Sequence, residues 1–298
     1  MKKILGIGMI IIIAAALLQG GTQSYVLSRS FILDYGYGPY QLGLLRGGEI
    51  PPLGPNAFAV DKNGDIFIAD PINDGLKVFS PGQGRVIKFL YVPGIYDDIL
   101  PDRDGNVFLL ERTSARIIKI DRWEEKSSVP IDAAFARHPC SLFLAGGSVL
   151  VKGRGDTYIP RTQKILPGIT LSNGKSCWTE YRDERSGVLN VFDRTRGEIV
   201  SFPVVRPSLA SIVFLGLDRQ GCYYVQTEFI VSESRVGLEV QKLGPRGELL
   251  ATIPIPENDY AVWTSRLLAV DEDGAIYQVL PRRENVKIHI WIPEGGPQ

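Results

Sequence analysis

A short pattern that recurs six times along the chain constrains its fold more than any other feature. A full copy has an apolar stretch, a turn of the form Asp-x-x-Gly and a second apolar stretch, and the two weaker copies keep the glycine without the aspartate. The clearest copies are FAVDKNGDIFIAD (58–70), ILPDRDGNVFLLE (99–111), FLGLDRQGCYYVQ (214–226) and LLAVDEDGAIYQV (267–279). Weaker copies are LFLAGGSVLVKG (142–153) and ITLSNGKSCWTE (169–180). The turn glycines lie on average about 42 residues apart, which is the repeat length of β-propeller blades, at Gly64, Gly105, Gly146, Gly174, Gly221 and Gly274.

The segments between the turns predict four antiparallel strands in each copy. The stretches on either side of a turn are rich in β-branched and aromatic residues and too short for helices. Third strands are expected at 76–80, 115–121, 187–193 and 237–243, and fourth strands at 85–90, 198–204 and 249–255. One such sheet cannot bury both of its faces, whereas a ring of six can. The sequence therefore predicts an all-β fold, a six-bladed β-propeller of four-stranded blades.

The two ends of the chain supply the closure of this ring. The last copy offers only three strands, in 265–271, 275–280 and 287–293. An unassigned strand, YVLSRSFILDY (25–35), precedes the first copy. We expect it to pair with 287–293 as the outer strand of the last blade. The alternative is a seven-bladed ring in which residues 25–50 belong to an extra blade.

One segment carries a family resemblance. PNAFAVDKNGDIFIADPINDGLKVFSPGQGRVIKFL (55–90) resembles an NHL repeat: Pro, strand, Asp-x-x-Gly, strand ending in Asp, Asn-containing loop, strand, Pro-x-x-Gly. The second copy is similar, with Glu111 where the first has Asp70, and the other four depart further. The resemblance implies a six-bladed propeller that binds proteins, nucleic acids or small ligands, with lactonase-like propellers and amidating lyases as enzyme relatives. The repeat is structural, so it transfers fold rather than function.

The first 24 residues resemble an export signal. Lys2 and Lys3 precede an uninterrupted apolar run from Ile4 to Leu18, which is short of the about 20 residues needed to span a bilayer. Thr22-Gln23-Ser24 fits the small-x-small rule for cleavage before Tyr25. We therefore expect a bacterial-type signal peptide at 1–24 and one propeller domain at 25–298, in the periplasm or outside the cell. The alternative is an uncleaved anchor, which would be the only contact with a membrane.

The charge balance limits the classes of binding partner, and the cysteine positions indicate the state of the thiols. The chain has 33 basic and 33 acidic residues, so it lacks the basic excess that nucleic-acid binding requires. We expect a monomer that binds a protein or a small ligand. The cysteines, Cys140, Cys177 and Cys222, lie among apolar residues in three different copies. They are interpreted as buried thiols, and one disulfide with one free thiol is the alternative.

Candidate binding residues come from a register eight residues before each turn glycine. Asn56, Asp97, His138 and Arg266 occupy this register, with Leu166 and Val213 in the other two copies. Residues there begin the innermost strands, so the polar ones would converge on the mouth of the channel, with Asp98 and Ser265 beside them. A carboxylate, an amide and an imidazole can hold a divalent ion such as Ca²⁺ or Zn²⁺, or act as acid and base. Asn56, Asp97 and His138 are the candidate metal ligands, although no cofactor is expected for a binding protein. The structural alternative for each polar residue is backbone capping.

A second register lies six residues after each turn glycine, at Asp70, Glu111, Lys152, Glu180, Thr227 and Leu280. Asp70, Glu111 and Glu180 match the NHL position whose acid holds its own loop. Glu180 is kept as a candidate ligand-binding residue because a charged loop, YRDERSG (181–187), follows it.

No catalytic signature is present: the chain contains no GxSxG, Walker A, dinucleotide-binding or HExxH motif, and only two histidines. The favoured hypothesis is therefore an exported propeller that binds a partner or ligand through its loop-bearing face. The first alternative is a metal-dependent hydrolase of the lactonase-like type that uses the mouth residues. The second is a structural module of an envelope assembly held by an uncleaved anchor.

Overall fold

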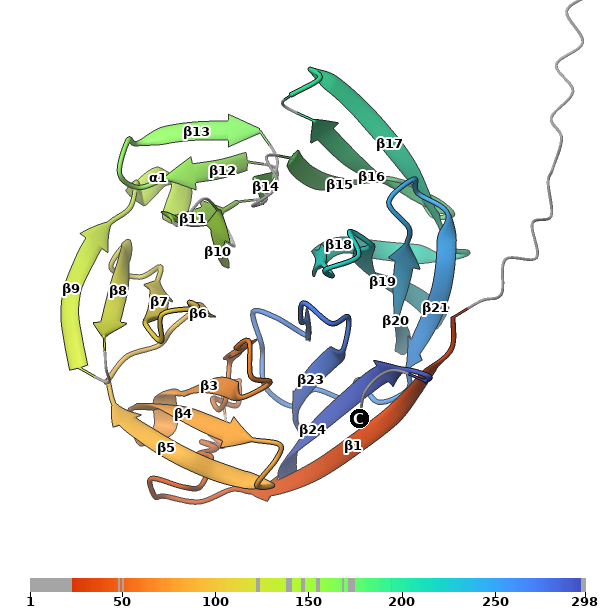
Figure 1. Ribbon diagram of the computed structural model, residues 1–298. Coiled ribbons are helices and arrows are strands. Elements are labelled where there is room, and N and C mark those ends of the chain that lie inside the picture. The colour runs from red at the N-terminus through yellow and green to blue at the C-terminus, as the bar shows by residue number, and fades with distance from the viewer. Residues whose placement is uncertain are drawn as a thin grey trace, which may run out of the picture.

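The protein is a ring of six β-sheets around a central channel (Figure 1). The computed structural model describes residues 23–47, 49, 51–121, 124–137, 141–145, 148–153, 156–167, 169–170, 175–193 and 195–295. Each sheet has four antiparallel strands. No helix in these ranges is long and apolar enough to cross a membrane. The predicted six-bladed β-propeller is confirmed, and the seven-bladed alternative is wrong.

The first three blades follow one another along the chain. Blade 1 contains β2 (Ala57–Val60), β3 (Ile66–Asp70), β4 (Gly75–Ser80) and β5 (Arg85–Tyr91), with the short helix η1 (Pro71–Asn73) after β3. Blade 2 contains β6 (Asp98–Pro101), β7 (Val107–Glu111), β8 (Arg116–Asp121) and β9 (Glu124–Pro130). Helix α1 (Ala133–Ala136) leads to blade 3, with β10 (Ser141–Ala145), β11 (Ser148–Lys152), β12 (Asp156–Ile159) and β13 (Lys164–Pro167).

The last three blades complete the ring. Blade 4 contains β14 (Ile169–Thr170), β15 (Lys175–Asp183), β16 (Ser186–Asp193) and β17 (Glu198–Val205). Blade 5 contains β18 (Leu209–Leu217), β19 (Tyr223–Ser232), β20 (Arg235–Leu243) and β21 (Leu249–Ile255). Blade 6 contains β22 (Leu268–Val270), β23 (Ile276–Pro281), β24 (Asn285–Pro293) and β1 (Tyr25–Asp34).

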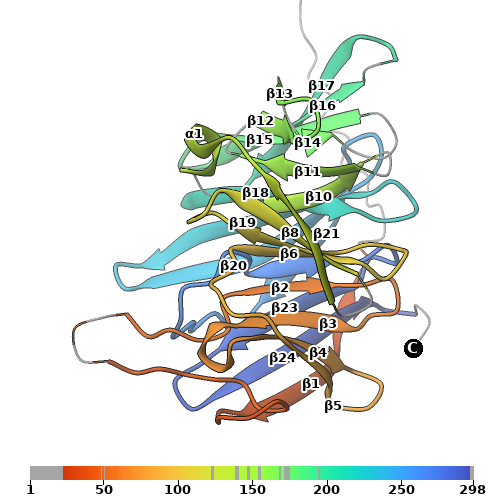
Figure 2. The same ribbon diagram turned by 90° about the vertical axis from the view of Figure 1, so that its left-hand side faces the viewer.

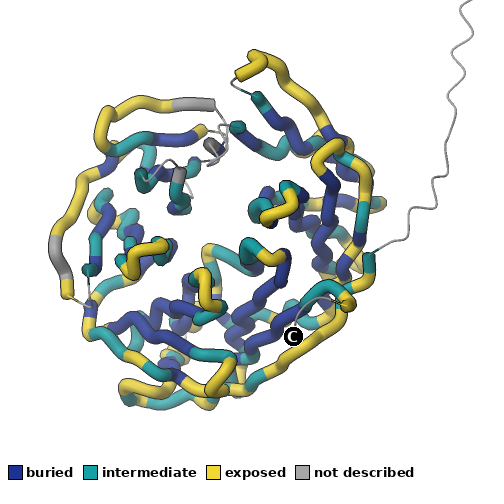
Figure 3. Tube along the Cα trace, viewed as in Figure 1, coloured by how far each residue is buried: buried dark blue, intermediate teal, exposed yellow. Residues whose placement is uncertain are grey.

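The predicted closure of the ring by the N-terminal strand is confirmed. β1 pairs antiparallel with β24, from Tyr25 opposite Pro293 to Asp34 opposite Asn285. The outermost strands, β1 among them, are largely exposed, while buried residues concentrate in the inner strands (Figure 3). A strand from one end of the chain thus covers the edge of the strand from the other end.

The Asp-x-x-Gly turns fold as the sequence predicts in the four copies whose turns lie in the described ranges. The glycines have φ between +79° and +85°, a region that side chains rarely adopt, at Gly64, Gly105, Gly221 and Gly274. The aspartate Oδ1 of each turn accepts bonds from the backbone N–H groups two and four residues later, at 2.8 to 3.0 Å, in Asp61, Asp102, Asp218 and Asp271. The aspartate therefore caps the turn rather than binding a ligand.

The hydrophobic core lies between neighbouring blades. One cluster joins blades 6 and 1, a second joins blades 1 and 2, and others join blades 2 and 3, 4 and 5, and 5 and 6. The free thiols of Cys177 and Cys222 are buried in two of these clusters, as expected, and Cys140 lies outside the described residues. Burial raises the pKa of the Cys177 thiol to about 12, so it stays protonated.

The ring has two different faces. The turn face carries the Asp-x-x-Gly turns, and the loop face carries the connections between blades and those between second and third strands. Residues 43–47 and 51–54 project from the loop face, on the left of Figure 2. This arrangement places residues at the start of each first strand, and at the end of each second strand, around the loop-face mouth of the channel.

Candidate functional site

A cavity of about 960 Å³ occupies the channel and reaches the loop face. Its walls are formed by the innermost strands of several blades and by the loop between β21 and β22. Many of the lining side chains are apolar, and the charged ones are Lys152, Glu228 and Arg266. The cavity is therefore an apolar chamber with a few charged groups on its wall, which is the usual form of a small-molecule site.

Arg266 reaches from blade 6 to Asp98, at the first residue of β6 in blade 2. The guanidinium Nη2 lies 2.9 Å from Asp98 Oδ2, and the same oxygen accepts a 2.7 Å bond from the backbone N–H of Leu142 in blade 3. Burial raises the pKa of Asp98, and Arg266 opposes that shift. One carboxylate thus links three blades beside the cavity.

Lys152, the last residue of β11 in blade 3, adds a second cation to this site. Burial, with a smaller contribution from the charge of Arg266, lowers the pKa of its amine to about 8, and the charge of Asp98 opposes this shift. Lys152 has no ion pair with any residue for which the structure gives a position. The group formed by Lys152, Arg266 and Asp98 therefore contains two cations and one carboxylate.

The other predicted mouth residues hold the fold together. Asn56 is buried, and its Nδ2 donates to the carbonyl of Tyr96 at 2.8 Å. The Asp97 carboxylate accepts two hydrogen bonds from Arg112, one from the side-chain Nε at 2.7 Å and one from the backbone N–H at 3.1 Å. Both side chains therefore hold the chain that leads into β6, which matches the capping alternative.

Glu180 lies apart from this group. Its carboxylate accepts a 2.9 Å bond from the indole of Trp178 in the same strand and pairs with Arg182 at 3.1 Å. It is not among the residues that line the cavity. Asp70 and Glu111 hold their own loops, through bonds to Asn73 and to Arg116.

In blades 4 and 5, the residue eight positions before the turn glycine does not lie at the start of the innermost strand. Leu166 lies in β13, the outermost strand of blade 3, because the outer strands of that blade are only four residues long and the copies are closely spaced there. Val213 lies in the middle of β18, because that strand is nine residues long. Neither residue begins an innermost strand, so the expected placement at the mouth is wrong for both.

The metal hypothesis stays a prediction. Within the described residues no three His, Cys, Asp or Glu side chains are grouped to hold an ion. His138, one of the three expected ligands, lies outside those residues. Asn56 Oδ1 is buried without a hydrogen-bond partner, whereas the Asp97 carboxylate binds Arg112.

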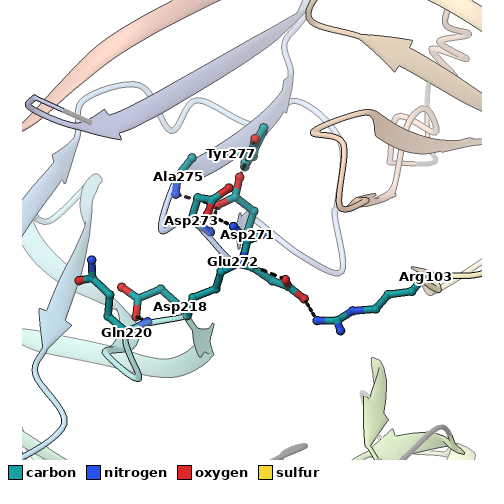
Figure 4. A network of polar contacts seen from close by, with 9 residues as sticks. Arg103, Asp218, Gln220, Asp271, Glu272, Asp273, Ala275 and Tyr277 are labelled. Atoms are coloured by element: carbon teal, nitrogen blue, oxygen red, sulfur yellow. Dashed lines mark hydrogen bonds and ion pairs between the residues drawn. The ribbon is translucent and has the colours of Figure 1, made fainter. Parts of the chain in front are cut away.

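Ion pairs cross the ring at the turn face. Glu272 of blade 6 pairs with Arg103 of blade 2 (Figure 4). Glu272 also pairs with Arg219 of blade 5, at 3.3 Å. Arg219 also pairs with Asp273 at 2.5 Å. These side chains are exposed, so each pair adds little stability. They place charged groups from three blades at the end of the channel opposite the loop face.

Sequence reasoning named Asp98 and Arg266 but did not select Lys152, Glu228 or Trp263. Lys152 appears in the second register, yet a single lysine there gives no sign of its neighbours. Burial raises the pKa of Glu228, which accepts a bond from Gln226 at 3.2 Å. Trp263 is 60% exposed in the loop between β21 and β22 and also lines the cavity. No repeat pattern marks that loop.

The charge of Lys152 should cost stability. Because its pKa falls from 10.5 to about 8 on folding, the unfolded chain binds the proton more tightly. The folded protein is destabilised by the full amount below pH 8, and this destabilisation disappears as the pH rises towards 10.5. We expect Lys152→Met to raise the free energy of unfolding by about 1–2 kcal/mol at pH 7, after solvent screening.

Urea unfolding between pH 7 and pH 10 measures this effect. The difference between Lys152→Met and the unaltered chain should shrink as the pH rises. Lys164→Met, at an exposed position of β13, serves as the control and should change stability by less than about 0.5 kcal/mol at every pH. A Lys152→Met variant less stable than the unaltered chain at pH 7 would contradict the buried-charge explanation.

No protein-family model matches the chain, and no curated protein matches it in sequence. Among solved structures, a chain of Kuenenia stuttgartiensis hydrazine synthase is similar, with a TM-score of 0.51, 13% identity, and coverage of 80% of this chain and 77% of that one. Virginiamycin B lyase from Staphylococcus aureus gives a TM-score of 0.47 with 11% identity, covering 90% of this chain and 99% of that one. The RRP9 WD40 repeats give 0.47 with 13% identity, covering 87% and 99%. At such identities the likeness to the hydrazine synthase chain concerns the fold alone, and the fold is a six-bladed β-propeller.

Proposed function

We propose that this propeller is an exported, monomeric binding protein that takes a small ligand into its central cavity from the loop face. The observation that carries the proposal is the cavity of about 960 Å³, which has apolar walls and charged groups from blades 3, 5 and 6. Pockets of this size and composition suit small organic molecules. The basic pair Lys2–Lys3 and the apolar run after it support the exported location.

Gly216 allows a direct test of the cavity. This glycine of β18 lines the cavity, and a Cβ placed on it would meet no atom within 4 Å. The Cβ therefore has open space around it, and we expect a phenylalanine side chain there to enter the cavity. Gly82 is a matched control in the turn between β4 and β5, where a Cβ would meet only the Ser80 hydroxyl oxygen, at 3.9 Å.

We expect a screen of small organic molecules by ligand-observed NMR to find compounds that bind residues 23–298. Gly216→Phe should abolish binding because the side chain occupies the cavity, and Gly82→Phe should leave it unchanged. Circular dichroism and thermal melting would verify that both variants fold. Binding that survives Gly216→Phe would place the ligand elsewhere, and a diverse screen without any binder would overturn the proposal.

A further inference from the structure

Two cations and one carboxylate lie near one another where blades 2, 3 and 6 border the cavity, while the acid Glu228 lies on the wall formed by blade 5. Arg266 and Lys152 line the cavity, Arg266 binds the Asp98 carboxylate, and the charge of Lys152 interacts with the charges of both groups. Asp98 already accepts bonds from Arg266 and from the backbone of Leu142. One positive charge, that of Lys152, is left without a partner among the described residues. Such a charge in a recess gains more from a counter-ion than a charge in water does.

The size of the imbalance selects the charge of the ligand. One surplus cation is neutralised by one carboxylate, whereas a phosphate dianion would leave an excess negative charge in the recess. A second carboxylate on the ligand is disfavoured by Glu228 on the wall formed by blade 5. Like charges in a poorly solvated cavity repel strongly. The cavity therefore suits a single negative charge.

The walls select the rest of the ligand. Much of the remaining lining is apolar, including Leu100, Phe143, Phe214 and Leu268. Trp263 offers an exposed aromatic ring beside the same cavity. An apolar chain or ring would bury its surface against these side chains, at roughly 25 cal/mol for each Å² removed from water.

We propose that the cavity binds a small monocarboxylic acid with an apolar body, whose carboxylate lies against Lys152 and Arg266. This inference rests on the proposed function, because it names the ligand class of the same cavity. Lys152 supplies a charge-assisted hydrogen bond, and Arg266 can share its guanidinium between Asp98 and the ligand. The apolar body extends along the inner strands.

Titration calorimetry with sodium hexanoate and with 1-hexanol, at pH 7, tests the inference. The two probes share an apolar chain and differ in the carboxylate. We expect hexanoate to bind at least tenfold more tightly than hexanol, because a buried charge-assisted bond is worth about one to two factors of ten. Lys152→Met should remove that preference, so that hexanoate binds no more tightly than hexanol. This variant is expected to fold stably, since it loses a costly charge.

The pH dependence separates a charge effect from a packing effect. The charge of Lys152 interacts with the charges of Arg266 and Asp98, and Glu228 lines the same cavity. Raising the pH from 7 to 10 should weaken hexanoate binding by tenfold or more as the Lys152 amine loses its proton, whose pKa is about 8 in the free protein. Lys152→Arg keeps its charge over this range and should bind hexanoate about equally at both pH values.

The outcomes are distinct. The carboxylate inference would be overturned if the protein bound hexanoate no more tightly than hexanol. It would also be overturned if Lys152→Met bound hexanoate as tightly as the unaltered chain does. If hexanol or a compound from the screen still binds and Gly216→Phe blocks it, the proposed function stands while this inference fails. If no compound enters the cavity at all, the proposed function fails as well.

Discussion

Asp70→Asn should lower the free energy of unfolding by about 3–5 kcal/mol, because it leaves the Lys77 ammonium buried without a counter-charge. The Nζ of Lys77 lies 2.7 Å from Asp70 Oδ2, and both side chains are 0% exposed. Lys77 also donates to the carbonyl oxygens of Gly38, at 2.9 Å, and Gln41. Burial lowers the pKa of Lys77, and the hydrogen bond to Asp70 opposes that shift.

The same carboxylate organises the segment that leads from β1 to β2. Asp70 Oδ2 accepts 2.9 Å bonds from the backbone N–H of Gly43 and from the Nδ2 of Asn73. Its loss should therefore loosen residues 36–43 as well as leave a charge unpaired. Hydrogen exchange at Gly43 would report this local effect separately from global unfolding.

Guanidinium unfolding of Asp70→Asn, Lys77→Met and the double variant measures the pair. The double variant should lose less unfolding free energy than the two single variants lose together, because neither charge is then buried without its partner. Asp104→Asn, an exposed acid in the turn between β6 and β7, is the control and should cost less than about 0.5 kcal/mol. A loss of less than 1 kcal/mol for Asp70→Asn would contradict the buried ion pair.

Removing residues 23–34 should abolish cooperative folding. The deletion takes away all of β1, whose pairing with β24 closes the ring. Phe31 and Leu33 pack against the core between blades 6 and 1, and Tyr25 packs against the core between blades 5 and 6. Loss of these contacts and of the cross-strand bonds is comparable to the whole stability of a domain, about 5–15 kcal/mol.

Further polar contacts depend on the start of this strand. Tyr25 OH lies 2.9 Å from Tyr224 OH, and the buried Lys242 donates to Gln23 Oε1 at 2.9 Å. Burial raises the pKa of the Tyr25 hydroxyl to about 12, so it remains a hydrogen-bond donor at neutral pH. The deletion therefore also leaves buried polar groups without partners, which adds to the cost.

Thermal melting followed by circular dichroism, with size-exclusion chromatography, measures the effect. A chain that begins at Gln23 is the control and should melt cooperatively as a monomer. The shortened chain should give no cooperative transition, or should aggregate through the exposed edge of β24. A synthetic peptide of residues 23–35 should restore folding. A cooperative melt within a few degrees of the control would show that β1 is dispensable.

Most of the fold could be read from short-range patterns. The Asp-x-x-Gly turns fix positive-φ glycines and aspartate caps at residues close in sequence, so the hairpins follow directly. The strand missing from the last copy pointed to residues 25–35. The register was wrong at Leu166 and Val213 because strand lengths differ between blades, and no local signal sets the length of β13 or β18.

The sequence by itself determined the number of blades, the strand order within each blade and the closure by the N-terminal strand, because these depend on repeat length and turn chemistry. It also marked Asp98 and Arg266 as residues near the mouth. Only the tertiary structure decided that Arg266 reaches Asp98 in another blade and that Lys152 lies near them with no ion pair to any described residue. The physical reason is that these side chains meet across a closed ring, where contact depends on blade geometry rather than on distance along the chain.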